Sequence, residues 1–190
     1  MSREATLRYL AVPLILFGIL LAPGLSAAAR PEPKIIEIHG QVKGEKATVR
    51  FRLYDAFTPE MVEALKSGIE ISFQTVVRVE RIHRNWFDVT VGEATVSRSV
   101  RHDSLSRVYR LSRGGVEETL PDLFSALDGM TSYEIVLPLR IPAVQGKFYQ
   151  ARIRTRLDRV GLSQPLRTIF FFSSIWDVET DWWKGDLSAP

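Results

Sequence analysis

The sequence contains no cysteine and only 3 histidines. The absence of thiols excludes disulfides, cysteine-based zinc sites and lipid attachment at a cysteine, so the packed core alone must hold the fold together. His39, His83 and His102 stand far apart in the chain, and no metal-ligand spacing connects them. We therefore predict neither a metal site nor a cofactor.

A strong excess of one charge is also missing, because 25 Lys and Arg face 22 Asp and Glu and the net charge is only +3. Nucleic-acid-binding domains normally carry a large basic excess, which argues against DNA or RNA as a partner. With 190 residues and 45% hydrophobic content, the chain suits one mid-sized globular domain. No internal repeat or low-complexity stretch divides it.

Residues 1–29 have the order of a secretory signal peptide. Arg3 and Arg8 precede an uncharged apolar run over 9–21, and small residues follow at 26–29. The run is shorter than the roughly 20 residues that a membrane span needs. We predict a helical signal peptide over 1–29, followed by a single β-rich domain over 30–190. The alternative is an uncleaved anchor, which would keep the protein on the membrane.

Most of the chain after residue 29 alternates polar and apolar residues, which is typical of strands with one buried face. Similar rows run through residues 69–79, 87–100, 109–111, 133–141 and 149–157. The clearest row has Ala47, Val49, Phe51 and Leu53 on one side and Lys46, Thr48, Arg50 and Arg52 on the other. Strands buried on one face pair antiparallel. The sequence therefore predicts a mainly β fold, an antiparallel β-sandwich or open barrel.

Two segments interrupt the alternation and predict short helices. Residues 58–60 (Thr-Pro-Glu) supply an N-cap, a proline for the first helical position and an acidic first turn, and Gly68 can end this helix. The second predicted helix covers residues 119–129, begins near Thr119 or Leu120 and stops at Gly129. Its predicted apolar face consists of Leu120, Leu123, Phe124 and Leu127.

Turn residues divide the predicted strands from one another. We predict that residues 103–104 (Asp-Ser) join two strands, that residues 114–115 (Gly-Gly) precede the second helix, and that residues 144–146 divide a long hairpin. Pro138 and Pro142 weaken the strand that contains them, because proline has no N–H for a neighbouring strand. This strand is therefore predicted at a sheet edge.

Three stretches of the chain resemble one bacterial family, the envelope proteins catalogued as domain of unknown function 4390. The stretches are Leu65–Phe73 followed by Arg78, Arg81 and Trp86, then Arg101–Leu111, and then Ser173–Trp182. The resemblance covers nearly all of the chain after the leader. It implies an exported or membrane-anchored protein of Gram-negative bacteria, in some members encoded beside a membrane sensor kinase. It implies no catalytic residue and no assigned activity.

Residues that could carry catalysis or bind calcium are few. Residues 161–165 (Gly-Leu-Ser-Gln-Pro) lack the second glycine that a nucleophile turn needs. Residues 102–104 (His-Asp-Ser) could contribute to a triad, but Asp-Ser is first of all a turn sequence. The acids in residues 177–181 begin like a calcium loop, yet the glycine and the final glutamate of such a loop are absent. We predict no catalytic residue and no metal ligand.

A row of arginines is the first candidate for a binding surface. Arg152, Arg154 and Arg156 alternate with less polar residues, so a strand would present three guanidinium groups on one face at a spacing of about 6.6 Å. Such a row suits phosphates, carboxylates and acidic polymers. The alternative is a solvent-facing strand whose arginines pair with Glu or Asp on the next strand.

The tryptophans near the C-terminus are the second candidate. Trp176, Trp182 and Trp183 could stack on sugars or lie at a membrane interface if they are exposed, and they would close one end of the core if they are buried. Trp182 and Trp183 are adjacent, so they cannot both face inward from a regular strand. One of the two is expected to be partly exposed.

The residues leave two functions open. We predict an exported protein of the periplasm or the outer face of the inner membrane. Its first predicted function is that of a non-catalytic binding or accessory module for a membrane protein or an anionic envelope polymer. The alternative is a hydrolase that acts on an envelope polymer.

Overall fold

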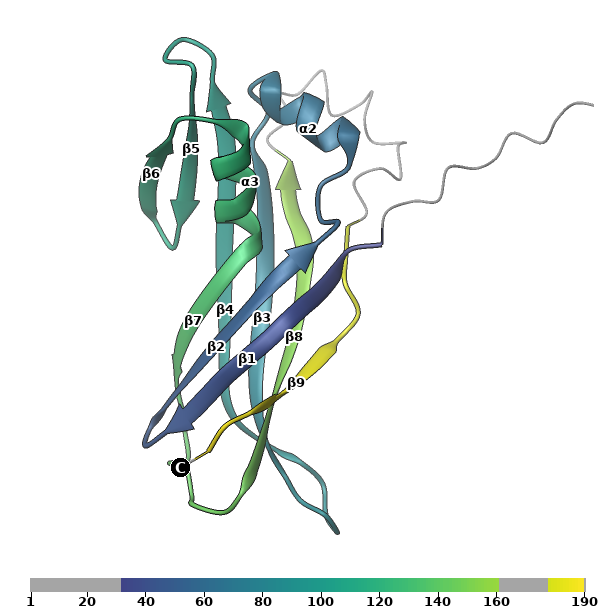
Figure 1. The fold of residues 1–190 in the computed structure, drawn as a ribbon, viewed down its shortest axis with the longest axis vertical. Coiled ribbons are helices and arrows are strands. Elements are labelled where there is room, and N and C mark those ends of the chain that lie inside the picture. The colour runs from purple at the N-terminus through teal and green to yellow at the C-terminus, as the bar shows by residue number, and fades with distance from the viewer. Residues whose placement is uncertain (1–31, 161–177, 190) are drawn as a thin grey trace, which may run out of the picture. The chain divides into compact units, whose positions relative to one another are not determined.

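The computed structural model describes residues 32–160 and 178–189, which form two antiparallel sheets and two short helices (Figure 1). The first sheet has three strands in the order β1 (Lys34–Lys43), β2 (Lys46–Tyr54) and β7 (Ser132–Pro138). The second has six, in the order β6 (Val116–Leu120), β5 (Val108–Arg113), β4 (Val89–Asp103), β3 (Ile71–Ile82), β8 (Phe148–Val160) and β9 (Trp183–Leu187). The predicted mainly β, antiparallel architecture with two short helices is confirmed.

Alternation of polar and apolar residues determines which face of each strand is buried. In β2, Ala47, Val49, Phe51 and Leu53 are buried, whereas Arg50 and Arg52 are exposed. The same period buries Phe73, Val77 and Val79 on β3. Residues from both sheets belong to one hydrophobic cluster, in which Phe51 stacks on Tyr133 with ring centroids 4.7 Å apart. Each large apolar side chain buried in this way contributes about 1.5–3 kcal/mol.

Strand β9 brings the two sheets together at one side. The Val42 N–H donates to the carbonyl oxygen of Ser188 (2.7 Å), and the Ser188 N–H donates to that of Gly40 (3.0 Å). Gly185 of β9 lies against Ile38 of β1 so closely that a Cβ at this position would overlap the isoleucine side chain. Glycine is required at this position because it alone permits the approach.

Helix α2 (Pro59–Lys66) forms where the sequence predicts it. The Thr58 hydroxyl caps the helix by accepting from the Met61 N–H at 3.2 Å, and Pro59 occupies the first turn. Two residues of the helix itself, Met61 and Leu65, are buried. After the helix, Gly68 adopts a φ of 86°, which lets its N–H donate to the Leu65 carbonyl.

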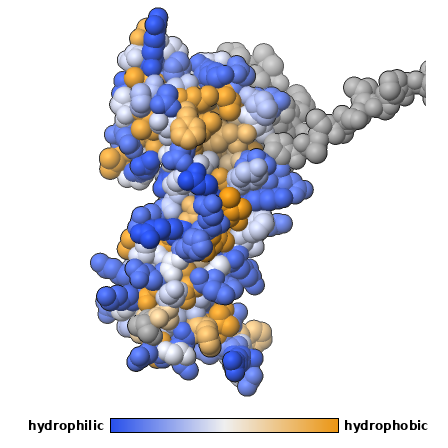
Figure 2. Space-filling model, viewed as in Figure 1, coloured by the Kyte–Doolittle hydropathy of each residue, from blue (hydrophilic) through white to orange (hydrophobic). Residues whose placement is uncertain are grey.

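Helix α3 (Leu123–Thr131) differs from its prediction in both position and face. It begins at Leu123 with Asp122 as N-cap and continues through Gly129, and the preceding residues form strand β6. A Cβ on Gly129 would lie 2.5 Å from a methyl carbon of Leu111, so this glycine permits close helix–sheet packing and does not end the helix. Phe124 is 81% exposed, while Ala126 and Met130 are buried. Apolar residues reach the surface around α3 (Figure 2).

Several predicted turns and strand ends also need correction. Gly114 and Gly115 adopt φ values of 57° and 89° and form the hairpin turn between β5 and β6, so they do not lead into α3. Residues 139–147 connect β7 to β8, which belong to different sheets, so they do not divide a hairpin. Phe87 is 84% exposed in the loop before β4, although the alternation places it on a buried row. Pro138 does end an edge strand, as predicted.

Among residues 32–160 and 178–189, no helix is both long and apolar enough to cross a membrane. The leader, residues 161–165 and Trp176 lie outside the residues that the structure describes.

Candidate functional site

The three predicted arginines of β8 lie on the outer face of the six-stranded sheet. Ile153 and Thr155, which alternate with them, are buried on the opposite face. The alternation of arginines with less polar residues therefore correctly predicted which side chains of β8 face outward.

Cationic residues from the neighbouring strands extend this row sideways. In the antiparallel register Arg78 of β3 stands opposite Arg152 of β8, and Lys184 of β9 stands opposite Arg152 on its other side. Directly opposed like charges destabilise a sheet unless other groups compensate them. Two kinds of compensation are present, namely acidic partners and an aromatic ring.

Each arginine of the row has a partner within the chain. Glu80 lies 3.2 Å from a terminal nitrogen of Arg152, and Glu179 lies 2.6 Å from one of Arg154. Arg156 donates twice to the side-chain oxygen of Gln74, at 2.7 and 3.1 Å. The alternative that the sequence left open, pairing with an acid on the next strand, is realised for Arg152, whose partner Glu80 is on β3. The partner of Arg154, Glu179, lies before β9. These partners still engage only part of each guanidinium group, which has five N–H donors.

Trp182 covers the centre of the row. Its ring lies 4.8 Å from the guanidinium carbon of Arg78, 5.3 Å from that of Arg152 and 6.0 Å from that of Arg154. These distances are within the range of cation–π attraction. Trp183, the next residue, pairs with Ile153 in the sheet and packs against the core. The two tryptophans thus use opposite faces, as predicted.

We call Arg78, Arg152, Arg154 and Trp182 the arginine–tryptophan face. The side chains of Arg152 and Arg154 are 30% and 41% exposed. Their Nε atoms are buried and have no hydrogen-bond partner among the described residues. A ligand cannot reach these buried Nε atoms, but the terminal nitrogens of the partly exposed guanidinium groups have N–H donors beyond those in the ion pairs, and such donors can bind a carboxylate or a phosphate.

His102 and Asp103 end β4, and Ser104 begins the turn that leads to β5. The Asp103 carboxylate accepts from the N–H groups of Leu105 and Ser106 (both 3.1 Å) and pairs with Arg110 at 3.0 Å. These bonds, the Ser106 N–H first and the Arg110 guanidinium next, lower the pKa of Asp103 to about 2. His102 contacts the Lys66 carbonyl oxygen through Nδ1 at 2.9 Å. The chemistry of this segment is therefore that of a turn.

No group of His, Asp and Glu within residues 32–160 and 178–189 is arranged to hold a metal ion. Glu179, one of the acids of the calcium-like run, is engaged by Arg154. Asp177 of the same run lies outside the described residues.

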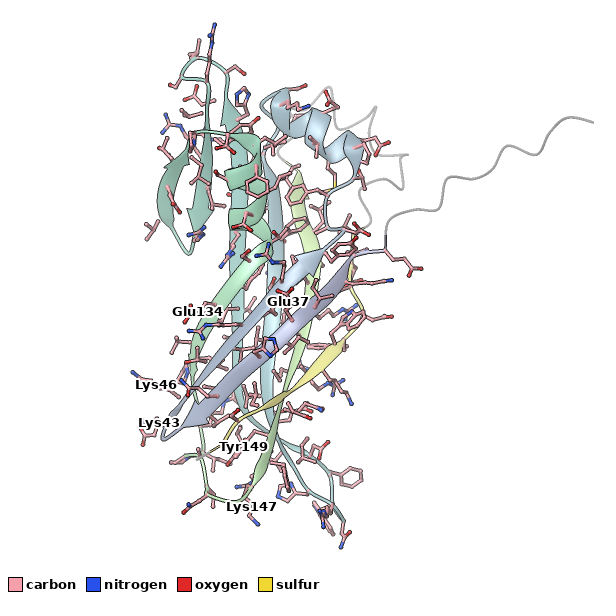
Figure 3. The ribbon with its side chains drawn as sticks, viewed as in Figure 1. Glu37, Lys43, Lys46, Glu134, Lys147 and Tyr149 are labelled. Carbon is pink, nitrogen blue, oxygen red and sulfur yellow. The ribbon has the colours of Figure 1, made fainter. Side chains whose placement is uncertain are left out.

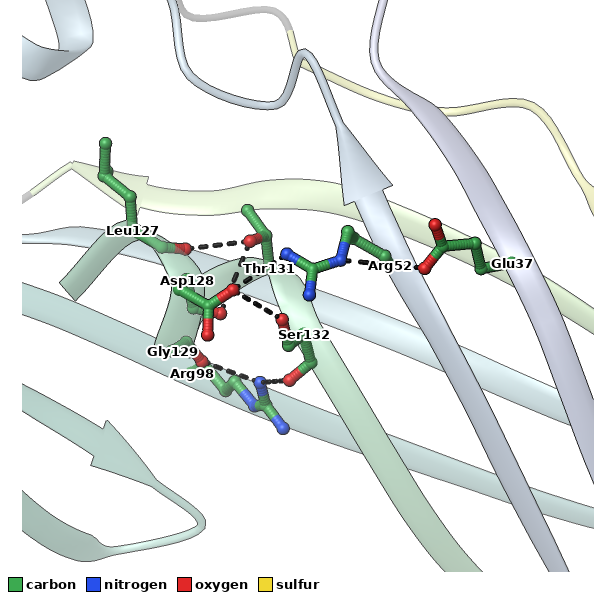
Figure 4. A network of polar contacts seen from close by, with 8 residues as sticks. All are labelled: Glu37, Arg52, Arg98, Leu127, Asp128, Gly129, Thr131 and Ser132. Carbon is green, nitrogen blue, oxygen red and sulfur yellow. Dashed lines mark hydrogen bonds and ion pairs between the residues drawn. The ribbon is translucent and has the colours of Figure 1, made fainter. Parts of the chain in front are cut away.

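Sequence reasoning missed a polar network in which Arg98 joins β4 to the end of α3 (Figure 4). Arg98 donates to the carbonyl oxygens of Gly129 (2.8 Å) and Ser132 (2.5 Å) and lies 3.7 Å above the Tyr133 ring. It thus satisfies carbonyls that a helix end leaves free. The sequence signal was present, because Arg98 interrupts the apolar row between Val96 and Val100.

Arg52 completes this network from the other sheet (Figure 4). Its guanidinium pairs with Asp128 at 2.8 Å and lies 3.8 Å from Glu37. The hydrogen bond from Arg52 is the largest cause that lowers the pKa of Asp128, with a further hydrogen bond from Ser132. The network ties a helix end to both sheets, so its role is structural.

The model of the family described as "Domain of unknown function (DUF4390)" matches residues 31–185. The family resemblance inferred from three stretches of the sequence is confirmed. No curated protein and no solved structure gives a significant match.

Proposed function

We propose that this chain, which belongs to the family described as a domain of unknown function (DUF4390), is a non-catalytic binding module of the bacterial envelope. The module is an open β-sandwich that holds an anionic partner on its arginine–tryptophan face. The observation that carries this proposal is the set of three guanidinium groups beside Trp182. Each is paired with one acid, Arg78 with Glu93, Arg152 with Glu80 and Arg154 with Glu179, and each pair leaves some of the guanidinium N–H donors free.

Rigidity is the first argument for binding at this face. Arg78 and Arg152 come from adjacent central strands of a six-stranded sheet, so their backbones are held by hydrogen bonds on both sides. Contact with the Trp182 ring restricts the motion of both guanidinium groups. Binding of a partner therefore avoids part of the entropic cost of ordering long side chains, which favours affinity.

The partner's chemistry follows from the free donors. Guanidinium groups bind carboxylates and phosphates through two parallel N–H bonds. A ligand of this class can add to the Arg154 donors that Glu179 leaves free, or it can replace Glu179. Both an anionic envelope polymer and an acidic segment of a membrane protein present these groups.

Export to the envelope is supported by the charged, apolar and small-residue order of residues 1–29. The periplasm, or the outer face of the inner membrane if the leader stays in place, is the proposed location. Cell fractionation of the full chain checks this part of the proposal.

The binding test titrates the full chain with polyphosphate and, separately, with polyglutamate in a calorimeter at low salt. Arg154→Glu should weaken binding of the better ligand by about tenfold, because it removes a donor and introduces repulsion. Arg101→Glu is the matched control, since Arg101 is exposed on β4 and its reversal changes the net charge equally. Thermal melts establish that both variants fold.

Equal weakening by the two substitutions would show that only the net charge matters and would reject this site. Binding of neither polymer by the parent chain would reject the anionic-partner proposal.

A further inference from the structure

A second surface, at one end of the molecule, exposes aromatic side chains to water. Trp86 is 78% exposed and Phe87 84% exposed, both in the loop between β3 and β4. Phe148, the first residue of β8, is 67% exposed. Exposed aromatics grouped at one end of a folded domain are unusual and indicate an interaction site.

The sheet holds these aromatic side chains in place. The hairpin is paired up to Arg81 and Val89, and the His83 N–H donates to the Asp88 carboxylate at 3.2 Å. Phe148 stands directly opposite Ile82 in the β3–β8 register. The Trp86 and Phe87 rings contact each other edge to face, with centroids 6.4 Å apart. The rings are therefore presented from a paired hairpin and do not fold back onto the core.

Basic side chains surround the same end. Lys43 and Lys46 flank the β1–β2 turn, and Lys147 precedes β8, at the lower end of the molecule (Figure 3). Arg84, in the same loop as Trp86, and Arg140, after β7, are also exposed. None of these five forms an ion pair within the described residues, and the acids of these loops are Asp88 and Glu45.

We propose that this aromatic–basic end, which comprises Arg84, Trp86, Phe87, Lys147 and Phe148, docks on an anionic lipid surface. Tryptophan and phenylalanine rings gain free energy in the boundary between headgroups and acyl chains, and unpaired lysines and arginines are attracted to anionic headgroups. The aromatic–basic end presents both exposed aromatic rings and, among the described residues, unpaired basic side chains on the same surface.

The shape of this end favours a bilayer over a folded protein partner. The connection between β3 and β4 projects at the lower end of the molecule (Figure 1), and Trp86 and Phe87 belong to this connection. A projecting tip enters a soft lipid surface without a matching cavity, whereas a protein partner would need one. The aromatic–basic end is separate from the arginine–tryptophan face, so the inference does not rest on the proposed function.

The absence of cysteine permits a site-specific test on the full chain. Phe87→Cys is labelled with an environment-sensitive fluorophore and mixed with vesicles of phosphatidylglycerol and phosphatidylcholine, or of phosphatidylcholine alone. Phe124→Cys is the matched control, because Phe124 is 81% exposed and belongs to α3, which lies far from the β3–β4 connection (Figure 1). We expect a blue shift at position 87 with anionic vesicles only, and none at position 124.

The charge requirement is tested in the same assay. Adding Arg84→Glu and Lys147→Glu to the labelled Phe87→Cys chain should raise the lipid concentration needed for half of the shift by about tenfold. Arg101→Glu with Arg107→Glu is the matched control, since both arginines are exposed at the β4–β5 end. The leader is identical in all variants, so it cannot account for a difference between them.

Three results would overturn the proposal. They are the absence of a shift at position 87 with anionic vesicles, an equal shift at position 124, and an equal shift with neutral vesicles. A shift at position 87 produced by soluble polyphosphate, with none from vesicles, would assign this end to a polyanion and would equally overturn the lipid assignment.

Discussion

The arginine–tryptophan face lies on the six-stranded sheet and the aromatic–basic end lies mostly in loops that connect to strands of that sheet, yet the two are built in opposite ways. On the face, Arg152 and Arg154 are paired with acids and covered by Trp182. At the end, Trp86 and Phe87 contact mainly each other and water. The strand β8 connects the two regions, from Phe148 at the end to Arg154 on the face.

The side chains of the arginine–tryptophan face contribute to the stability of the fold, whereas those of the aromatic–basic end do not. A paired charge and a stacked ring contribute to the free energy of unfolding, so selection for stability alone can retain them. An exposed tryptophan contributes little to the folded state and exposes apolar surface to water. The aromatic–basic end is therefore harder to explain by stability, while the face can serve both stability and binding.

Of the variants that compare the two regions, Arg152→Ala on the face is expected to have the largest effect on stability. Its partner Glu80 is only 7% exposed, so the substitution leaves a buried carboxylate without its cation. We expect the free energy of unfolding to fall by about 2 kcal/mol in urea titrations, less than for a fully buried pair because Arg152 is partly exposed.

Two further variants separate this effect from a general loss of charge. Arg101→Ala removes an exposed arginine from β4 and should change stability by less than about 0.5 kcal/mol. Adding Glu80→Gln to Arg152→Ala should recover part of the loss, because it removes the buried charge. Similar losses for Arg152→Ala and Arg101→Ala would show that the face is not stabilised by this pair.

An intermediate effect on stability is expected at the β4–β5 turn, which lies at the end of β4 away from the aromatic–basic end. The Asp103 side chain there bonds to groups of the same turn and to Arg110. The pKa of Asp103 is held at about 2, below its ordinary value of 3.8, by its hydrogen bonds. Because the folded-state pKa is depressed, the stabilisation is complete above about pH 4 and is lost as the pH falls toward 2. The stability difference between the parent chain and Asp103→Asn should therefore shrink over this range in urea titrations.

A difference that stays constant from pH 6 to pH 2 would show that the Asp103 charge does not stabilise the turn. Asp88→Asn is the comparison at the aromatic–basic end. The Asp88 side chain accepts a hydrogen bond from the His83 N–H. At about pH 6 we therefore expect Asp88→Asn to lower the free energy of unfolding by less than Asp103→Asn does.

The sequence predicted much of the fold because burial follows a period of two along each strand. The rows in β2 and β3 and the cap of α2 depend on nearby residues alone, and these predictions are confirmed. Helix α3 was misplaced because Gly129 looks like a helix end in sequence, whereas its role is to let the helix approach Leu111 on β5. That reason is visible only in three dimensions.

The candidate site was predictable only in part for the same reason. Alternation along β8 was enough to place its arginines on one face. The addition of Arg78 and the cover by Trp182 depend on strand order and register, which bring together residues far apart in the chain. Phe87 was missed because the apolar alternation continues into the hairpin loop, where no opposite sheet covers it.

The smallest expected effect on stability is at the aromatic–basic end. Trp86→Ser with Phe87→Ser should change the free energy of unfolding by less than about 0.5 kcal/mol, because both side chains are already in water. Phe73→Ala, on the buried face of β3, the strand that leads into this loop, should cost about 3–5 kcal/mol. Urea titrations of the three chains measure the contrast. A large loss for the double variant would mean that the rings stabilise the hairpin, and stability would then be sufficient to explain their presence.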